Sequence, residues 1–232
     1  MIQIRKSEDR GAVDFGWLDT KHTFSFGHYD DPRFRGFRDL LVLNEDRVEA
    51  GKGFGEHGHR DMEIVSYVVD GQLGHRDSTG NGSTLEPGDV QRMTAGRGIR
   101  HSEMNGSETD PVHFLQIWIP PAEAGLEPGY EEKRFSPDDK RNRLRPIVTE
   151  DGRDGSLRIH QDAAIFASVL EAGQSVKHTF ATGRHGWVQV IRGEIEADGT
   201  TLSAGDGAAL AELDSLTVTA KQETEFLLFD LR

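Results

Sequence analysis

Short apolar runs separated by turn sequences are the feature that most limits how this chain can fold. Pairs such as Asp70-Gly71 and Arg192-Gly193 follow the runs closely, and 27 of the 232 residues are glycine. This density of turns is typical of β-sandwiches and barrels rather than of alternating strands and helices. We therefore expect an all-β chain with only short helices, whose candidate strands include Asp39–Leu43, Glu63–Val69, His113–Ile119, Trp187–Ile191 and Thr224–Phe229.

The distribution of proline divides the chain. Residues 120–146 hold five of the eight prolines, and no proline follows. We predict an N-terminal domain over residues 1–120, a linker over 121–145 and a C-terminal domain over 146–232. The strings Thr84–Asp89 and Thr201–Asp206 resemble each other, which suggests that the two halves arose by duplication of one β-module.

The charge of the chain excludes several classes of partner. There are 27 Lys and Arg residues against 40 Asp and Glu residues, a formal net charge of -13. Such a surface repels nucleic-acid phosphates and anionic membranes. No apolar run approaches the roughly 18 residues of a membrane-spanning helix, and the first residues lack the apolar core of a secretory signal. We expect a cytoplasmic protein that binds neither nucleic acid directly nor membranes.

The absence of cysteine leaves histidine and carboxylates as the strong metal ligands. His57, His59 and Glu63 share the same parity, so in an extended strand their side chains point to one face. His101 and Glu103 form a second pair of the same kind. Each of the two expected strands therefore carries potential metal ligands on one face. We predict a metal site where the two strands meet.

These residues lie in segments that resemble the two cupin motifs. The segment Gly51–Glu63 is similar to the first motif, and Gly88 followed by Ala95–His101 is similar to the second. More narrowly, three strings resemble the pirin family of bicupins: His59-Arg-Asp-Met-Glu63, Gly74-His-Arg-Asp-Ser78 and Met93-Thr-Ala-Gly-Arg-Gly-Ile-Arg-His-Ser-Glu103. The resemblance implies a bicupin of two double-stranded β-helix (jelly-roll) barrels, with metal only in the N-terminal barrel.

The resemblance also implies the ligand set. It assigns His57, His59, His101 and Glu103 to the metal, and leaves Glu63 as an alternative ligand or a residue that supports the ligands. Glu103 or Glu63 would act as the catalytic base. In the second half, the positions that correspond to the ligands are occupied by Thr179, Ala181, Val218 and Ala220.

The implied cofactor is one divalent transition metal. Fe(II) follows from the resemblance, and Mn, Ni, Co, Zn or Cu would suit the same donors. The implied function is a dioxygenase that cleaves a flavonol such as quercetin (a 2,3-dioxygenase), or a related enolic or phenolic compound, and that binds this small aromatic substrate and O₂. Ring opening and loss of CO would follow. The alternative is an iron- or redox-responsive regulatory protein that acts through a protein partner and turns over substrate incidentally.

Aromatic side chains are expected to line the substrate pocket. His22 and His28 flank one aromatic segment and are expected near the pocket mouth. The candidate lining residues are Phe24, Phe26, Phe54, Phe114 and Trp118.

Overall fold

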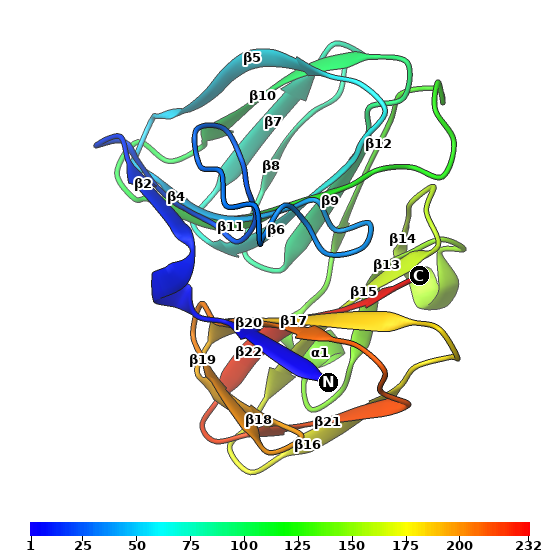
Figure 1. The fold of residues 1–232 in the computed structure, drawn as a ribbon. Helices are drawn as coiled ribbons and strands as arrows, with labels where there is room; N and C mark the ends of the chain where they lie inside the picture. Colours follow the sequence, from blue (N-terminus) through cyan, green and yellow to red (C-terminus); the bar gives the residue numbers. More distant parts are fainter.

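The computed structural model describes residues 1–232 and contains 22 β-strands. The strands form two barrels, stacked one above the other in Figure 1, and each barrel pairs a seven-stranded sheet with a four-stranded sheet. The only helices are α1 (Pro137–Lys140) and two short 3-10 helices, Ser7–Asp9 and Arg153–Gly155. The expected all-β fold with short helices is confirmed. None of these helices has the length and apolar character that crossing a membrane requires.

The N-terminal barrel carries the predicted metal motifs. Its large sheet has the order β12-β9-β6-β11-β4-β3-β2 and its small sheet the order β5-β10-β7-β8. The large sheet consists of β2 (Gly11–Asp14), β3 (Leu18–His22), β4 (Val42–Val48), β6 (Glu63–Asp70), β9 (Asp89–Thr94), β11 (Val112–Ile119) and β12 (Gly129–Arg134). The small sheet consists of β5 (Gly53–His59), β7 (Leu73–Asp77), β8 (Gly82–Leu85) and β10 (Ile99–Asn105).

The C-terminal barrel repeats this plan. Its large sheet has the order β1-β20-β17-β22-β15-β13-β14 and its small sheet the order β16-β21-β18-β19. The large sheet consists of β1 (Ile2–Arg5), β13 (Arg145–Thr149), β14 (Leu157–Arg158), β15 (Ala163–Leu170), β17 (His185–Arg192), β20 (Gly207–Leu210) and β22 (Thr224–Leu231). The small sheet consists of β16 (Ser175–Thr179), β18 (Glu194–Ala197), β19 (Thr200–Ser203) and β21 (Ser215–Ala220).

Four of the five candidate strands coincide with β6, β11, β17 and β22. The fifth was placed too early, since β4 begins at Val42 rather than at Asp39. Phe37 and Leu40 exchange backbone hydrogen bonds around a turn, in which Arg38 has a φ of 55°. This turn keeps the preceding residues out of the strand.

An apolar core of 24 buried residues lies between the two barrels and is formed by the facing sides of the two large sheets. In β6, Val65, Tyr67 and Val69 belong to this core, whereas Ile64 and Val68 face the interior of their own barrel. Both faces of β6 are therefore buried. A strand buried on both faces has a nearly continuous apolar sequence, which explains why this run does not alternate.

Two strands cross the predicted domain boundaries. β1, at the start of the N-terminal half, pairs with β20 and extends the large sheet of the C-terminal barrel. β12, inside the predicted linker, pairs with β9 and extends the large sheet of the N-terminal barrel. The division into residues 1–120, 121–145 and 146–232 stays a prediction. The exchanged strands tie the two barrels together.

The hairpin turns at Gly71 and Gly193 occupy equivalent places in the two barrels. Gly71 has a φ of 76° and Gly193 a φ of 81°. A Cβ at Gly71 would lie 2.4 Å from the Pro111 carbonyl oxygen, and one at Gly193 would lie 2.4 Å from the Glu223 carbonyl oxygen. Only glycine fits both the backbone conformation and the space. The weak repeat in the sequence thus corresponds to a repeated turn.

A buried polar network joins α1 to both large sheets. Lys140 Nζ donates hydrogen bonds to Tyr67 Oη at 2.6 Å and to Glu225 Oε1 at 3.0 Å. The Lys140 side chain is 4% exposed and that of Glu225 is 15% exposed. An ion pair with so little exposure is costly to break on one side, because the remaining charge is left without a partner.

Replacing Lys140 with methionine should destabilise the protein by about 3 kcal/mol, since Glu225 would lose its only buried cationic partner. The measurement is the free energy of unfolding in urea. Lys221→Met is the matched control, because its pair with Glu196 is about half exposed (43% and 41%) and should contribute less than about 1 kcal/mol. Equal losses in the two variants would contradict this interpretation of the network.

Candidate metal centre and pocket

The paired strands β5 and β10 bring three predicted ligands together. The strands are antiparallel, and His57 lies directly opposite His101. His59 is two residues further along β5, so its side chain points to the same face. The register shifts between His101 and Glu103, which is characteristic of a β-bulge. The sequence alternation therefore gives the correct face for all three histidines.

The spacing of the ring nitrogens is that of ligands to one ion. His101 Nε2 lies 3.0 Å from His59 Nε2 and 3.1 Å from His57 Nε2. Two nitrogens at about 2.1 Å from one ion and at right angles to each other would be about 3 Å apart. The three imidazoles form one group of potential metal ligands. The centre fits a single divalent metal.

The protonation of these rings also suits metal binding. His57 Nδ1 donates a hydrogen bond to the Gly55 carbonyl oxygen at 2.8 Å, which leaves the Nε2 lone pair free. Burial lowers the pKa of His59 to about 4, with a further contribution from His57. Burial and then the neighbouring histidines lower the pKa of His101 to about 3. The rings of His59 and His101 are neutral near pH 7, as metal ligation requires.

Glu103 is held beside the histidines by a network of uncharged donors. Its side chain is buried, and Oε1 accepts hydrogen bonds from Ser66 Oγ at 2.9 Å and Gln91 Nε2 at 2.6 Å. Oε2 accepts a hydrogen bond from Gln116 Nε2 at 2.6 Å. Burial raises the pKa of the Glu103 carboxyl, and this effect outweighs the lowering by the Ser66 and Gln116 hydrogen bonds and by the nearby His75 and His57.

His75 was missed as a residue of the site. It lies opposite Glu103 on β7, its Nε2 is 3.2 Å from Asp77 Oδ2, and its ring stacks on Tyr130 at 4.5 Å. The ligand atoms of His75, His101 and Glu103 lie within 4.8 Å of one another, whereas Glu103 has no such grouping with the other two histidines. The sequence signal was the string containing His75, which supported the resemblance without a role being given to it.

The structure does not bring Glu63 into the group of potential ligands formed by the three histidines. Glu63 is fully buried; it accepts a hydrogen bond from Thr94 Oγ1 at 2.9 Å and lies 3.0 Å from His160 Nδ1 of the other barrel. The parity argument fails because β5 ends at His59. The chain then turns through Asp61, which has a φ of 49°, into β6 of the other sheet.

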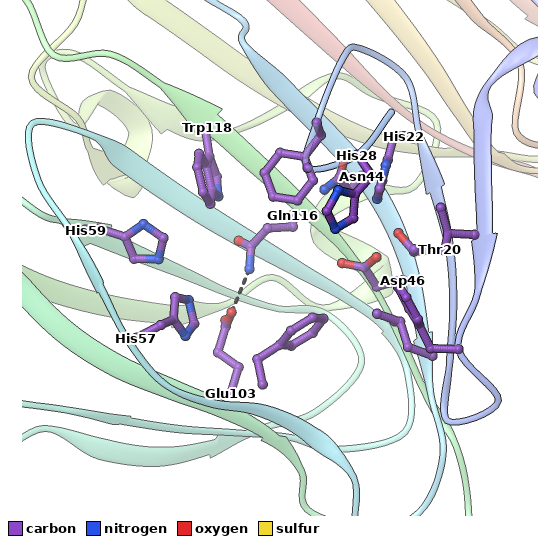
Figure 2. A pocket seen from close by; sticks show the side chains of 16 residues that line it. Thr20, His22, His28, Asn44, Asp46, His57, His59, Glu103, Gln116 and Trp118 are labelled. Carbon is purple, nitrogen blue, oxygen red and sulfur yellow. Dashed lines mark hydrogen bonds between the residues drawn. The ribbon is translucent and has the colours of Figure 1, made fainter. Parts of the chain in front are cut away.

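A pocket of about 310 Å³ opens from His57, His59 and Glu103 into the barrel (Figure 2). This volume is at the lower end of the range that small-molecule sites occupy, about 300–1,000 Å³. Phe26, Phe54 and Trp118 line it, as expected, and so do His22 and His28.

Two of the expected lining residues lie elsewhere. Phe24 packs on Trp187 in the core between the barrels, with ring centroids 5.0 Å apart. Phe114 belongs to the apolar cluster at one end of the N-terminal barrel. The sequence could not separate these phenylalanines from the lining residues, because aromatic side chains serve equally well in a core and in a pocket wall.

The C-terminal barrel has a different interior. Sixteen buried apolar residues form its core, and they include Val218 and Ala220 at positions that correspond to two of the predicted ligands. His178 lies 2.7 Å from Asp230 Oδ2, and His185 lies beside an arginine of the N-terminal half. The histidines of this barrel are thus engaged with charged groups.

Two stacked jelly-roll barrels, with converging imidazoles in one of them, define a bicupin with a candidate metal centre. The family model described as Pirin matches residues 3–119, and the model described as quercetinase C-terminal cupin domain matches residues 146–231. Together they cover most of the sequence. The chain belongs to the pirin family.

Similar proteins share both the sequence and the fold. The chain is 44% identical to quercetin 2,3-dioxygenase of Escherichia coli strain K12 over 231 residues, which cover 100% of this chain and 99% of that protein. The crystal structure of YhhW from Escherichia coli matches with a TM-score of 0.97 and 44% identity, over 100% of this chain and 98% of that one. A structure of the bacterial pirin YhhW in complex with nickel(II) matches with a TM-score of 0.95 and 43% identity, over 100% and 99%.

About one divalent metal ion per chain is expected, and His57→Ala and His101→Ala should each lower the metal affinity by at least about 100-fold, because each removes a converging donor. Elemental analysis after dialysis measures the metal content. His178→Ala is the control and should retain the metal, since this ring lies in the other barrel. Unchanged occupancy in both ligand variants would refute the assignment.

Proposed function

We propose that this chain is a mononuclear metal-dependent dioxygenase that cleaves a flavonol such as quercetin, or a related enolic or phenolic compound. The observation that carries the proposal is the convergence of three ring nitrogens at one end of a pocket with aromatic walls. The name of the 44% identical relative supports the same substrate class.

We propose His57, His59, His101 and Glu103 as the ligands, and Fe(II) as the resident metal. Imidazole and carboxylate donors suit iron as well as manganese, nickel, cobalt, zinc and copper. Four protein donors are fewer than the six of an octahedral ion, so exogenous ligands have room. When bound, the metal would polarise the enol oxygen of the substrate and mediate electron transfer to O₂.

The residues of the chain supply binding and proton transfer. Phe26 and Trp118 meet edge to face, with ring centroids 5.3 Å apart, and offer a wall on which substrate rings can pack away from water. Glu103 is the proposed acceptor of the substrate hydroxyl proton, because its raised pKa brings a carboxylate closer to the pH at which it must act as a base. Gln116 and Gln91 fix the orientation of the Glu103 carboxylate.

The regulatory alternative has no comparable support. Neither the relatives described above nor a feature of the fold points to a protein partner. The substrate partners that we propose are a small aromatic molecule and O₂.

Iron-loaded protein should consume flavonol and O₂ together, because the proposed reaction has no other oxidant. The measurement combines the loss of flavonol absorbance with an oxygen electrode and detection of CO. Metal-free protein is the control and should be inactive. An iron-loaded preparation that leaves a panel of flavonols intact would refute the proposed function.

Glu103→Gln keeps the size of the side chain and removes the proposed base. Compared with wild-type protein at equal measured iron content, so that loss of a ligand is accounted for, it should lower kcat by about 100-fold or more, as expected for loss of a general base. A kcat within about threefold of the wild-type value would rule Glu103 out as the base.

A further inference from the structure

The pocket wall opposite the histidines carries a second group of polar side chains. Thr20 and His22 on β3 pair directly with Asp46 and Asn44 on β4. All four are buried within the protein and all four line the pocket. Figure 2 shows them together on one side, across from His57 on the other. We call these four residues the polar wall.

The polar wall holds two atoms that the protein itself leaves without partners. His22 Nδ1 and Asn44 Oδ1 are buried and have no hydrogen-bond partner. Buried polar groups in native proteins are nearly always hydrogen-bonded, so two such atoms on one pocket wall require an explanation. The simplest explanation is a ligand that supplies the missing hydrogen-bond partners.

Asp46 is the member of the polar wall best suited to accept a hydrogen bond from a ligand. Its residue is only 4% exposed, and burial raises the pKa of its carboxyl to about 7. The neighbours that act on the carboxyl are the Thr20 hydroxyl and the like charges of Glu103, Glu45 and Asp19. No cation compensates it, so an uncharged donor from a ligand would stabilise this group.

Other buried carboxylates and amides in the same barrel have hydrogen-bonding partners within the protein. Glu45, the neighbour of Asp46, accepts a hydrogen bond from Arg10 Nη2 at 2.5 Å and lies 3.0 Å from His113 Nε2. Gln91 and Gln116 are bound to Glu103 at 2.6 Å each. Unpaired buried atoms also occur elsewhere in this barrel, for example on Arg10 and Arg92. Those of the polar wall differ because their residues line the pocket, where a ligand can reach them.

We propose that the polar wall recognises hydroxyl groups on the substrate rings that lie away from the oxygen held at the histidines, with Asp46 as the main acceptor. The polar wall thus selects polyhydroxylated flavonols over flavonols whose only hydroxyl is the one in the chelating group. Asn44 Oδ1 adds a second acceptor, and the Thr20 hydroxyl orients Asp46. The identity of the ligand rests on the proposed function, whereas the selectivity of the wall has its own test.

The test measures binding without turnover. Protein loaded with Zn(II), which has no redox chemistry, is titrated with quercetin and with 3-hydroxyflavone, which has the same chelating group and no other hydroxyl. Asp46→Asn should weaken quercetin binding by about tenfold or more, as for loss of a hydrogen bond to a charged group, and change 3-hydroxyflavone binding by less than twofold. Thr20→Val, which removes only the hydroxyl, should act in the same direction by about threefold.

Two controls define specificity. Asp138→Asn removes the same charge from a side chain that is 90% exposed on α1, and should leave both affinities unchanged. Phe15→Ala removes an apolar lining residue and should weaken both flavonols alike. Melting temperatures check the fold, and Asp46→Asn should not lower the melting temperature, because the carboxyl has no cationic partner to lose.

The outcomes separate this inference from the proposed function. Selective loss of quercetin binding supports the polar wall, even if iron-loaded protein cleaves no flavonol. Equal effects on the two flavonols, no effect of Asp46→Asn, or no binding of quercetin by the wild-type protein would each overturn it. If iron-loaded protein cleaves both flavonols and Asp46→Asn keeps the same preference for quercetin over 3-hydroxyflavone, the proposed function stands. The proposed role of the polar wall is then refuted.

Discussion

Apolar contact between the two large sheets is the constraint on which the rest of the molecule depends. The 24-residue core between the barrels buries the outer faces of both sheets, and this burial provides much of the hydrophobic stabilisation. Strands such as β6 and β22 must then be apolar on the face that meets the other barrel. The inner face of each barrel remains free to differ.

The interiors of the two barrels differ in polarity. The C-terminal barrel fills its interior with a 16-residue apolar core, whereas the N-terminal barrel confines apolar clusters to its ends and places polar groups between them. Burying Glu103 is costly, and the hydrogen bonds from Ser66, Gln91 and Gln116 offset that cost while fixing its position. The polar, pocket-containing interior of one barrel thus contrasts with the apolar interior of the other.

Strand alternation and family motifs predict much of this architecture from sequence. The three histidines could be predicted because His57 shares a strand face with His59, and His101 has the same parity as Glu103. The all-β fold could be predicted from the density of turns. Glu63 was misplaced because the parity argument was carried through a turn at Asp61, where the chain leaves one sheet for another. Alternation holds only while the backbone stays extended.

Other features depend on tertiary contacts that no local pattern encodes. The pairing of β1 with β20 joins residues some 200 positions apart, and the polar wall on β3 and β4 has no motif of its own. Threonine, asparagine and aspartate are mostly exposed in folded proteins, so only the pocket shows that Asp46 and Asn44 point inward.

The most direct test of the central claim is the anomalous scattering of the metal-loaded protein in a crystal. One strong peak should lie about 2.0–2.3 Å from Nε2 of His57, His59 and His101, with a Glu103 carboxylate oxygen at a similar distance. Such a peak would establish the centre from which the proposed chemistry follows. A peak at His75 without His57 and His59, or no peak in fully loaded protein, would contradict it.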